Sequence, residues 1–340
     1  MVIGPVKLPA NQPRQFYAGG QAIAELRGVP RVDEFRPEDW VASTTTRFGQ
    51  QLDGLSTLPD GLLLRDAIKA APRAWLGADH VTAFGADPAL LVKLLDAGQR
   101  LPVHCHPSDE FAHQHFGCRF GKTEAWAVIG VGDNPDPTVH IGFSKAVTAE
   151  QLAGWVANQD RAAMIGALNS VPVAPGDAVF IPAGLPHAIG RDVFVVELQQ
   201  PTDLSITLEW RDFLADERAG HLGIGFDAAL GCVDRADWGA GERFRSLVRH
   251  AGDGEPLMDL FGARADAFFR AQRLRVDGAI ELEPSFAVLI TLDGAGLLHT
   301  ERGGSVDVTA GDTLVVPYEA GASTLTGELT AIRARPPKTH

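Results

Sequence analysis

The stretch Val173–Pro182, VAPGDAVFIP, recurs 135 residues later as VTAGDTLVVP at Val308–Pro317. Each copy joins a Gly-Asp turn to an apolar run that ends at a proline, which is typical of a tight turn followed by a buried strand. A period this long excludes a solenoid made of short repeats. The two copies therefore predict two similar β units within one chain.

The composition agrees with a globular β protein. The length of 340 residues suggests about two domains. A hydrophobic content of 45% with 21% charged residues excludes disordered, collagen-like and coiled-coil proteins. With 37 glycines, 22 prolines and only 7% aromatic residues, the chain favours turn-rich β structure over a helical bundle. We therefore expect a mainly β fold.

Charge and cysteine content limit the partners and the compartment. A formal net charge of −13 would repel nucleic acid and anionic membranes. A small anionic substrate stays compatible, because a local pocket can be positive on a negative protein. Three cysteines cannot build a disulfide framework, which indicates a reducing compartment. We see no signal peptide and no apolar run near the length of a membrane span, and we expect a cytoplasmic protein.

The pattern of apolar and turn residues predicts the organisation of the chain. Helices are expected at 61–71, 88–97 and 148–168, and strands at 101–106, 125–130, 138–142, 171–181 and 192–209. We predict a first domain at 1–210 with a helical insertion at about 57–98, a partly helical connection at 211–270, and a second β unit at 271–340.

A cluster of candidate metal ligands lies in the first unit. His104 and His106 are two residues apart on a predicted strand, so both side chains point to one face. Glu124 opens the next strand, and His187 follows the strand of the first repeat copy. Three imidazoles and a carboxylate suit Zn²⁺, Fe²⁺, Mn²⁺ or Ni²⁺ and leave room for substrate or water. Ala322 stands opposite His187 in the second copy, so we expect one metal site only.

The carboxylate ligand has an alternative. The spacing across Gly98–Gly117 fits the first motif of the cupin superfamily, which would make Glu110 the ligand. However, residues 107–121 read as a long loop rather than a tight hairpin, and the next convincing strand begins beside Glu124. We therefore favour Glu124 over Glu110.

Motifs in the first 210 residues resemble the type I mannose-6-phosphate isomerases. The similar segments occur in the expected order, at Leu90–Gly98, Leu101–Pro107, Gly121–Trp126, Pro182–Ala188 and Glu197–Gln200. The resemblance implies a pair of cupin-type jelly-roll β-barrels with a helical insertion. It also implies reversible interconversion of mannose 6-phosphate and fructose 6-phosphate with one zinc ion per chain. We expect a monomer or homodimer that binds a small sugar or sugar phosphate.

The resemblance also assigns residues. Its metal ligands fall on His104, His106, Glu124 and His187, although the first of these is normally a glutamine. Lys122 stands at an active-site lysine of the family and could bind phosphate or a sugar hydroxyl.

Two other family positions have changed in this chain. The family serine two residues before the first ligand is Pro102, and its catalytic arginine aligns with Thr207. Threonine cannot replace the charge and fork of an arginine. Arg211 lies four residues on, about 13 Å along a strand, and would need a shifted register to substitute. Lys122 and Arg211 are thus the catalytic candidates, and Lys122 and Thr207 the substrate-binding ones.

An isomerase of this kind would work through a cis-enediol. The metal would polarise the C1 or C2 oxygen of the open-chain sugar while a base moves a proton between the two carbons. The sequence leaves open whether that base is a metal-activated water or an acidic side chain. The alternatives are a non-catalytic sugar-binding cupin, an isomerase acting on a different sugar, and an iron-dependent cupin oxygenase.

Overall fold

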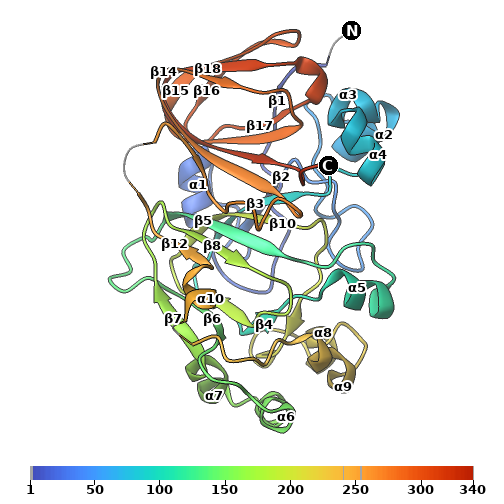
Figure 1. The fold of residues 1–340 in the computed structure, drawn as a ribbon, viewed down its shortest axis with the longest axis vertical. Helices are drawn as coiled ribbons and strands as arrows, with labels where there is room; N and C mark the ends of the chain where they lie inside the picture. The colour runs from blue at the N-terminus through green and yellow to red at the C-terminus, as the bar shows by residue number, and fades with distance from the viewer. Residues whose placement is uncertain (1–2, 240, 253–254, 340) are drawn as a thin grey trace.

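Two β units lie one on the other in the computed structural model, which describes residues 3–239, 241–252 and 255–339 (Figure 1). The first unit contains a six-stranded and a five-stranded antiparallel sheet. The six-stranded sheet has the order β12 (Val248–Arg249), β8 (Ala178–Ile181), β5 (Glu124–Gly130), β10 (Phe194–Gln199), β3 (Leu91–Asp96), β2 (Glu38–Val41). The five-stranded sheet has the order β11 (Ile206–Thr207), β4 (His104–Cys105), β9 (His187–Ile189), β6 (Thr138–Phe143), β7 (Leu168–Pro172).

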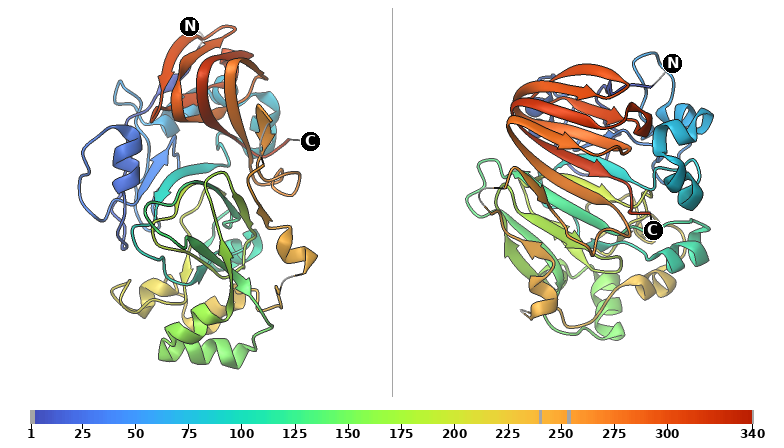
Figure 2. Two further views of the ribbon diagram at one scale, coloured as in Figure 1. Left: turned by 90° about the vertical axis from the view of Figure 1, so that its left-hand side faces the viewer. Right: turned by 45° about the horizontal axis from the view of Figure 1, so that its top comes forward.

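The second unit is one curled seven-stranded sheet, drawn in orange and red in Figure 2 except for its first strand. Its path is β1 (Val6–Lys7), β17 (Thr313–Val316), β15 (Ala287–Thr300), β18 (Ser323–Arg335), β14 (Arg270–Leu282), β13 (Leu257–Asp259), with β16 (Gly304–Thr309) paired to β15. The expected mainly β fold with two β units is confirmed. The domain boundaries at 210 and 270 stay predictions. Strand pairing does not follow them strictly, because β1 pairs with the second unit and β12 pairs with the first.

The repeated motif builds the same turn twice. The glycine before each aspartate has a positive φ, 98° at Gly176 and 85° at Gly311, a conformation that favours glycine. The carboxylate of each aspartate accepts a hydrogen bond from the backbone N–H three residues earlier, at 3.0 Å for Asp177 and 2.8 Å for Asp312. The turns then begin β8 and β17, which confirms the predicted turn-and-strand repeat.

Short helices surround the sheets. They are α1 (Gln21–Arg27), α2 (Leu64–Ala70), α3 (Pro72–Leu76), α4 (Ala78–Phe84), α5 (Asp109–Phe116), α6 (Ala149–Asn158), α7 (Arg161–Gly166), α8 (Glu217–Gly220), α9 (Phe226–Ala229) and α10 (Glu242–Arg245), with 3₁₀ turns η1 (Leu230–Cys232) and η2 (Tyr318–Ala320). Helices α2–α4 lie beside the second unit, where α3 contacts η2 (Figure 1). Within the described residues, no helix is both long enough and apolar enough to cross a bilayer.

Three sequence predictions of local structure are wrong. The expected helix at 88–97 is instead strand β3, whose six residues are all buried. A continuous apolar run of that length has no periodicity that separates a helix from a strand with both faces covered. The expected helix at 148–168 is two helices, because Gln159 adopts a left-handed conformation with φ of 51°. Part of the expected loop at 107–121 is helix α5, whose first turn Ser108 caps by accepting from the Phe111 N–H at 3.2 Å.

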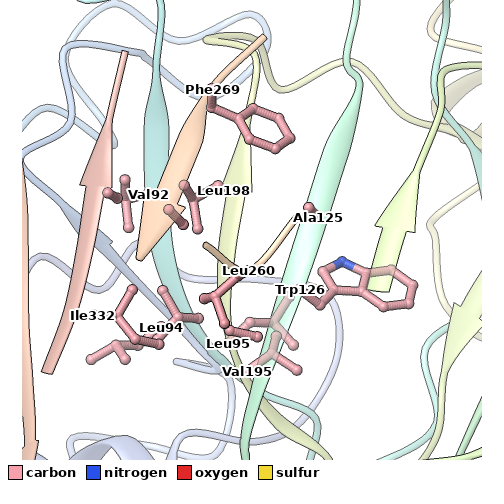
Figure 3. Close-up of a cluster of buried hydrophobic side chains, with 14 of the residues drawn as sticks. Val92, Leu94, Leu95, Ala125, Trp126, Val195, Leu198, Leu260, Phe269 and Ile332 are labelled. Carbon is pink, nitrogen blue, oxygen red and sulfur yellow. The ribbon is translucent and has the colours of Figure 1, made fainter. Parts of the chain in front are cut away.

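The two units share one hydrophobic core. Figure 3 shows side chains of β3, β5 and β10 beside side chains of the second unit, among them Val92, Leu94, Trp126 and Leu198 from the first, and Leu260, Phe269 and Ile332 from the second. Because β3, β5 and β10 also border the ligand cluster, this shared core fixes one wall of the candidate site.

Replacing Leu94 by alanine tests the shared core. Leu94 is fully buried, so the cavity left behind should lower the free energy of unfolding by about 2–5 kcal/mol. Leu52 is 62% exposed, and Leu52→Ala should change it by less than about 0.5 kcal/mol. Urea denaturation followed by circular dichroism measures both. Equal effects of the two substitutions would contradict a core at this position.

Candidate metal centre

Three histidines and a glutamate meet inside the first unit. His104 on β4 is the register partner of His187 on β9, and His106 follows β4 on the same side. The ring centroids lie 5.0 Å apart for His104 and His106, 4.2 Å for His104 and His187, and 4.9 Å for His106 and His187. One nitrogen from each ring lies within 4.8 Å of the others. Cys105, between the first two, points instead into a separate apolar cluster.

Backbone carbonyls orient all three rings. The Nδ1 atom of each histidine lies 2.8–2.9 Å from a carbonyl oxygen, belonging to Pro102 for His104, Leu204 for His106 and Leu185 for His187. A carbonyl only accepts, so each Nδ1 carries the hydrogen. Each Nε2 then presents a lone pair toward the centre of the cluster, as a metal-ligating imidazole requires.

The atoms at the centre of the cluster have no hydrogen-bond partner. The Nε2 atoms of His106 and His187 lie 2.9 and 3.2 Å from the Glu124 carboxylate oxygens. Both nitrogens and one of these oxygens, Oε2, are buried without a hydrogen bond in the described part of the chain. Lone pairs facing a carboxylate repel one another unless a cation lies between them. The four side chains therefore fit a divalent ion, and the buried histidine cluster indicates a metal site.

Electrostatics keep His104, His106 and Glu124 in the states that bind metal. Burial, together with the charge of Lys122, lowers the pKa of His106 to about 3. Burial also holds the pKa of His104 well below its usual range. For Glu124 burial alone would raise the pKa, but Lys122, with Nζ 3.1 Å from Oε2, and His106 hold it well below its usual range. Neutral imidazoles and an ionised carboxylate are the forms that coordinate a cation.

The structure separates the two carboxylates considered from the sequence. Glu124 opens β5, and its Oε1 accepts a hydrogen bond from the Trp126 indole N–H at 3.1 Å, which orients it toward the histidines. Glu110 lies in the first turn of α5 and is exposed to solvent. The structure thus brings Glu124 to the histidine cluster and leaves Glu110 outside it.

A cavity of about 650 Å³ borders the cluster. Lys122, Pro102 and Thr207 line it together with His104 and the neighbouring ligands. Thr207 on β11 is the register partner of His104, so the position aligned with the family arginine does face the site.

Arg211 does not line this cavity. Its guanidinium lies over the Trp210 ring, 5.4 Å from the centroid, and its backbone N–H donates to the Gln159 side chain at 2.8 Å. The structure therefore does not bring Arg211 to the site.

Sequence reasoning missed a buried charge network on the same cavity. Lys93 is 2% exposed, and its Nζ lies 3.3 Å from a carboxylate oxygen of Glu38 and 3.3 Å from one of Glu197. Its ammonium also faces the Trp40 ring at 4.8 Å. The available signal was a lone lysine inside the apolar run LLVKLLD, which was assigned to a helix. Lys93, Glu38 and Glu197 all line the cavity.

Comparison with known proteins confirms the resemblance to mannose-6-phosphate isomerases. The chain is 38% identical over 194 residues to mannose-6-phosphate isomerase ManA of Bacillus subtilis, a match covering 56% of each protein. It is 28% identical over 225 residues to the mannose-6-phosphate isomerase of Streptococcus mutans, covering 64% of this chain and 65% of the relative. These matches span less than two thirds of the length of the two curated relatives. No protein-family model matches the chain.

The fold is similar to that of a solved mannose 6-phosphate isomerase. The structure of this enzyme from Bacillus subtilis superposes with a TM-score of 0.75 at 20% identity, over 98% of this chain and 99% of the other. This likeness confirms the expected pair of cupin-type β-barrels.

Removing one ligand should remove the metal. Purified protein should contain about one divalent ion per chain by elemental analysis, and His187→Ala should weaken binding by more than the 10- to 100-fold typical of losing an outer partner alone. His140, on β6, bonds the Ser170 hydroxyl at 3.1 Å outside the cluster, so His140→Ala should retain the ion. The site assignment fails if the wild type binds no metal or if both variants bind it equally.

Proposed function

We propose that this chain is a metal-dependent aldose–ketose isomerase that interconverts mannose 6-phosphate and fructose 6-phosphate. The observation that carries the proposal is the pair of histidine Nε2 atoms that face the Glu124 carboxylate without a hydrogen bond, beside a cavity large enough for a hexose phosphate. The similarity to mannose-6-phosphate isomerases supports the reaction and the substrate. We also propose a reducing, cytoplasmic setting, which the three free cysteines support, and a monomer or homodimer.

We propose zinc as the ion, held by His104, His106, Glu124 and His187. Imidazole and carboxylate ligands suit zinc, and iron, manganese and nickel are the alternatives for elemental analysis. When bound, such an ion polarises the sugar oxygens and makes the hydrogen on the neighbouring carbon more acidic. Lys122, 6% exposed and on the cavity wall, is placed to bind a sugar oxygen near the ligands. The Thr207 hydroxyl beside His104 is a second substrate-binding group.

Asp203 is our candidate for the proton-transferring base. It lines the cavity, and one carboxylate oxygen accepts from the Phe48 N–H at 3.1 Å, which leaves the other for substrate. Burial raises the pKa of Asp203, and the positive charge of Lys93 offsets part of this rise. A raised pKa brings a carboxylate closer to the range that is effective for taking a proton from carbon. The pKa of Glu197 is also raised by burial, but Lys93 occupies its carboxylate. Asp203 would move the proton between C1 and C2 through a cis-enediol.

Isomerisation in heavy water tests the reaction and the base together. The zinc-loaded protein should convert mannose 6-phosphate to fructose 6-phosphate with deuterium incorporated at C1, because the abstracted proton exchanges with solvent. Asp203→Asn should lower kcat by about 10²- to 10⁴-fold while the zinc content is unchanged. Asp133 is exposed on a loop, and Asp133→Asn should have no effect.

Three results would contradict this proposal. Absence of turnover by the metal-loaded wild type would reject the isomerase and favour a sugar-binding protein or an enzyme for a different sugar. Turnover without deuterium incorporation would contradict exchange of the abstracted proton with solvent, and together with full activity of Asp203→Asn it would reject the enediol in favour of hydride transfer. Full activity of Asp203→Asn would place the base elsewhere.

A further inference from the structure

We propose that Arg218 and Arg47 together bind the phosphate of the substrate, and that Arg218 supplies the charge that is missing at Thr207. The inference rests on the proposed function for the identity of the sugar. The two arginines come from separate segments and line the same cavity as the candidate ligands His104, His106 and Glu124. They make the cavity selective for a phosphorylated sugar over the free sugar.

Close packing of α8 on β11 determines where Arg218 lies relative to the cavity. A Cβ atom on Gly220 would lie only 2.9 Å from the Thr207 carbonyl oxygen, so this glycine permits a close approach of the two backbones. The Asp216 carboxylate accepts from the Ala219 N–H at 3.0 Å and fixes the start of the turn. Arg218 lies between these two anchors, and its side chain reaches the cavity on which Thr207 also lies.

The Arg218 guanidinium is available for an anion. Arg218 is exposed, and across residues 3–239, 241–252 and 255–339 its side chain makes no ion pair or hydrogen bond. The nearest acidic residue in sequence on the cavity wall, Asp216, uses one carboxylate oxygen at the Ala219 N–H. An exposed arginine at the mouth of a cavity can move onto a ligand without breaking an existing bond.

Arg47 brings a second guanidinium to the cavity. One of its terminal nitrogens lies 3.1 Å from the Asp53 carboxylate, and its Nε is buried with no hydrogen-bond partner in the described chain. The next residue, Phe48, donates its N–H to Asp203, which ties this loop to the cavity wall. Arg47 thus has a guanidinium N–H without a partner, on a loop that is anchored to the cavity wall.

The two lysines of the cavity are paired with buried glutamates. Lys122 lies 3.1 Å from Glu124, and Lys93 lies between Glu38 and Glu197. The reacting C1 and C2 atoms must lie at the buried ligands, so the phosphate on C6 must lie toward solvent. Among the arginines and lysines of the cavity, Arg47, 30% exposed, and Arg218, exposed, are the ones that solvent reaches. Two guanidinium groups can form parallel N–H···O bonds with one phosphate, which one lysine cannot.

Calorimetric titration and steady-state kinetics of the zinc-loaded protein test the proposal. We expect Arg218→Ala to weaken mannose 6-phosphate binding and lower kcat/KM by about 10- to 100-fold, with mannose binding unchanged. Arg218→Lys should recover part of the loss, and Arg47→Ala should act in the same direction. Arg191 is exposed and pairs with Asp192 outside the cavity, so Arg191→Ala is the matched control and should behave as the wild type. Urea denaturation verifies that each variant is folded.

The outcomes separate this proposal from the proposed reaction. If the wild type binds mannose 6-phosphate without converting it, and Arg218→Ala loses that binding, the phosphate site stands and the isomerase fails. If the wild type converts mannose 6-phosphate, and Arg218→Ala and Arg47→Ala do so with unchanged kcat/KM, the phosphate site is overturned and the isomerase stands. If the wild type binds mannose and mannose 6-phosphate equally well, the phosphate site is overturned.

Discussion

Repulsion between the buried imidazole nitrogens and the Glu124 carboxylate is the constraint on which the first unit depends. The Nε2 atoms of His106 and His187 lie 2.9 and 3.2 Å from carboxylate oxygens of Glu124, and neither nitrogen has a hydrogen-bond partner in the described chain. Backbone carbonyls hold the rings in this orientation, so rotation cannot relieve the contact. The sheet thus maintains an arrangement of donors that only a cation completes. Strand pairing, ring orientation and carboxylate ionisation all direct ligand atoms to the centre of the candidate metal site.

Charge compensation extends from that point through the cavity. Glu124, Glu38 and Glu197 are all buried, and two buried lysines lie 3.1–3.3 Å from their carboxylates, so two positive charges face three negative ones. Removing one member of such a network would leave an uncompensated buried charge, which is strongly unfavourable. The deep part of the cavity therefore carries an excess of negative charge, and binding of an anionic substrate depends on the arginines nearer the solvent.

The sequence predicts the two β units well because their signals are local. The Gly-Asp turns and the spacing of His104 and His106 each depend on a few neighbouring residues. Strand β3 was mistaken for a helix, since an apolar run buried on both faces has no periodicity. The charge network around Lys93 and the position of Arg218 depend on residues that are distant in sequence, brought together by sheet pairing and by close backbone packing at Gly220. Such contacts leave no pattern in a single sequence.

The pairing of β1 with β17 has a consequence for biosynthesis. Lys7 and Asp312 form an ion pair of 2.7 Å although 305 residues separate them. Strand β1 has no partner until β17 has been synthesised, so the edge of the second sheet and the core shared with the first unit stay open until then. We expect nascent chains of this protein to depend on chaperones for longer than chains whose domains close one after the other.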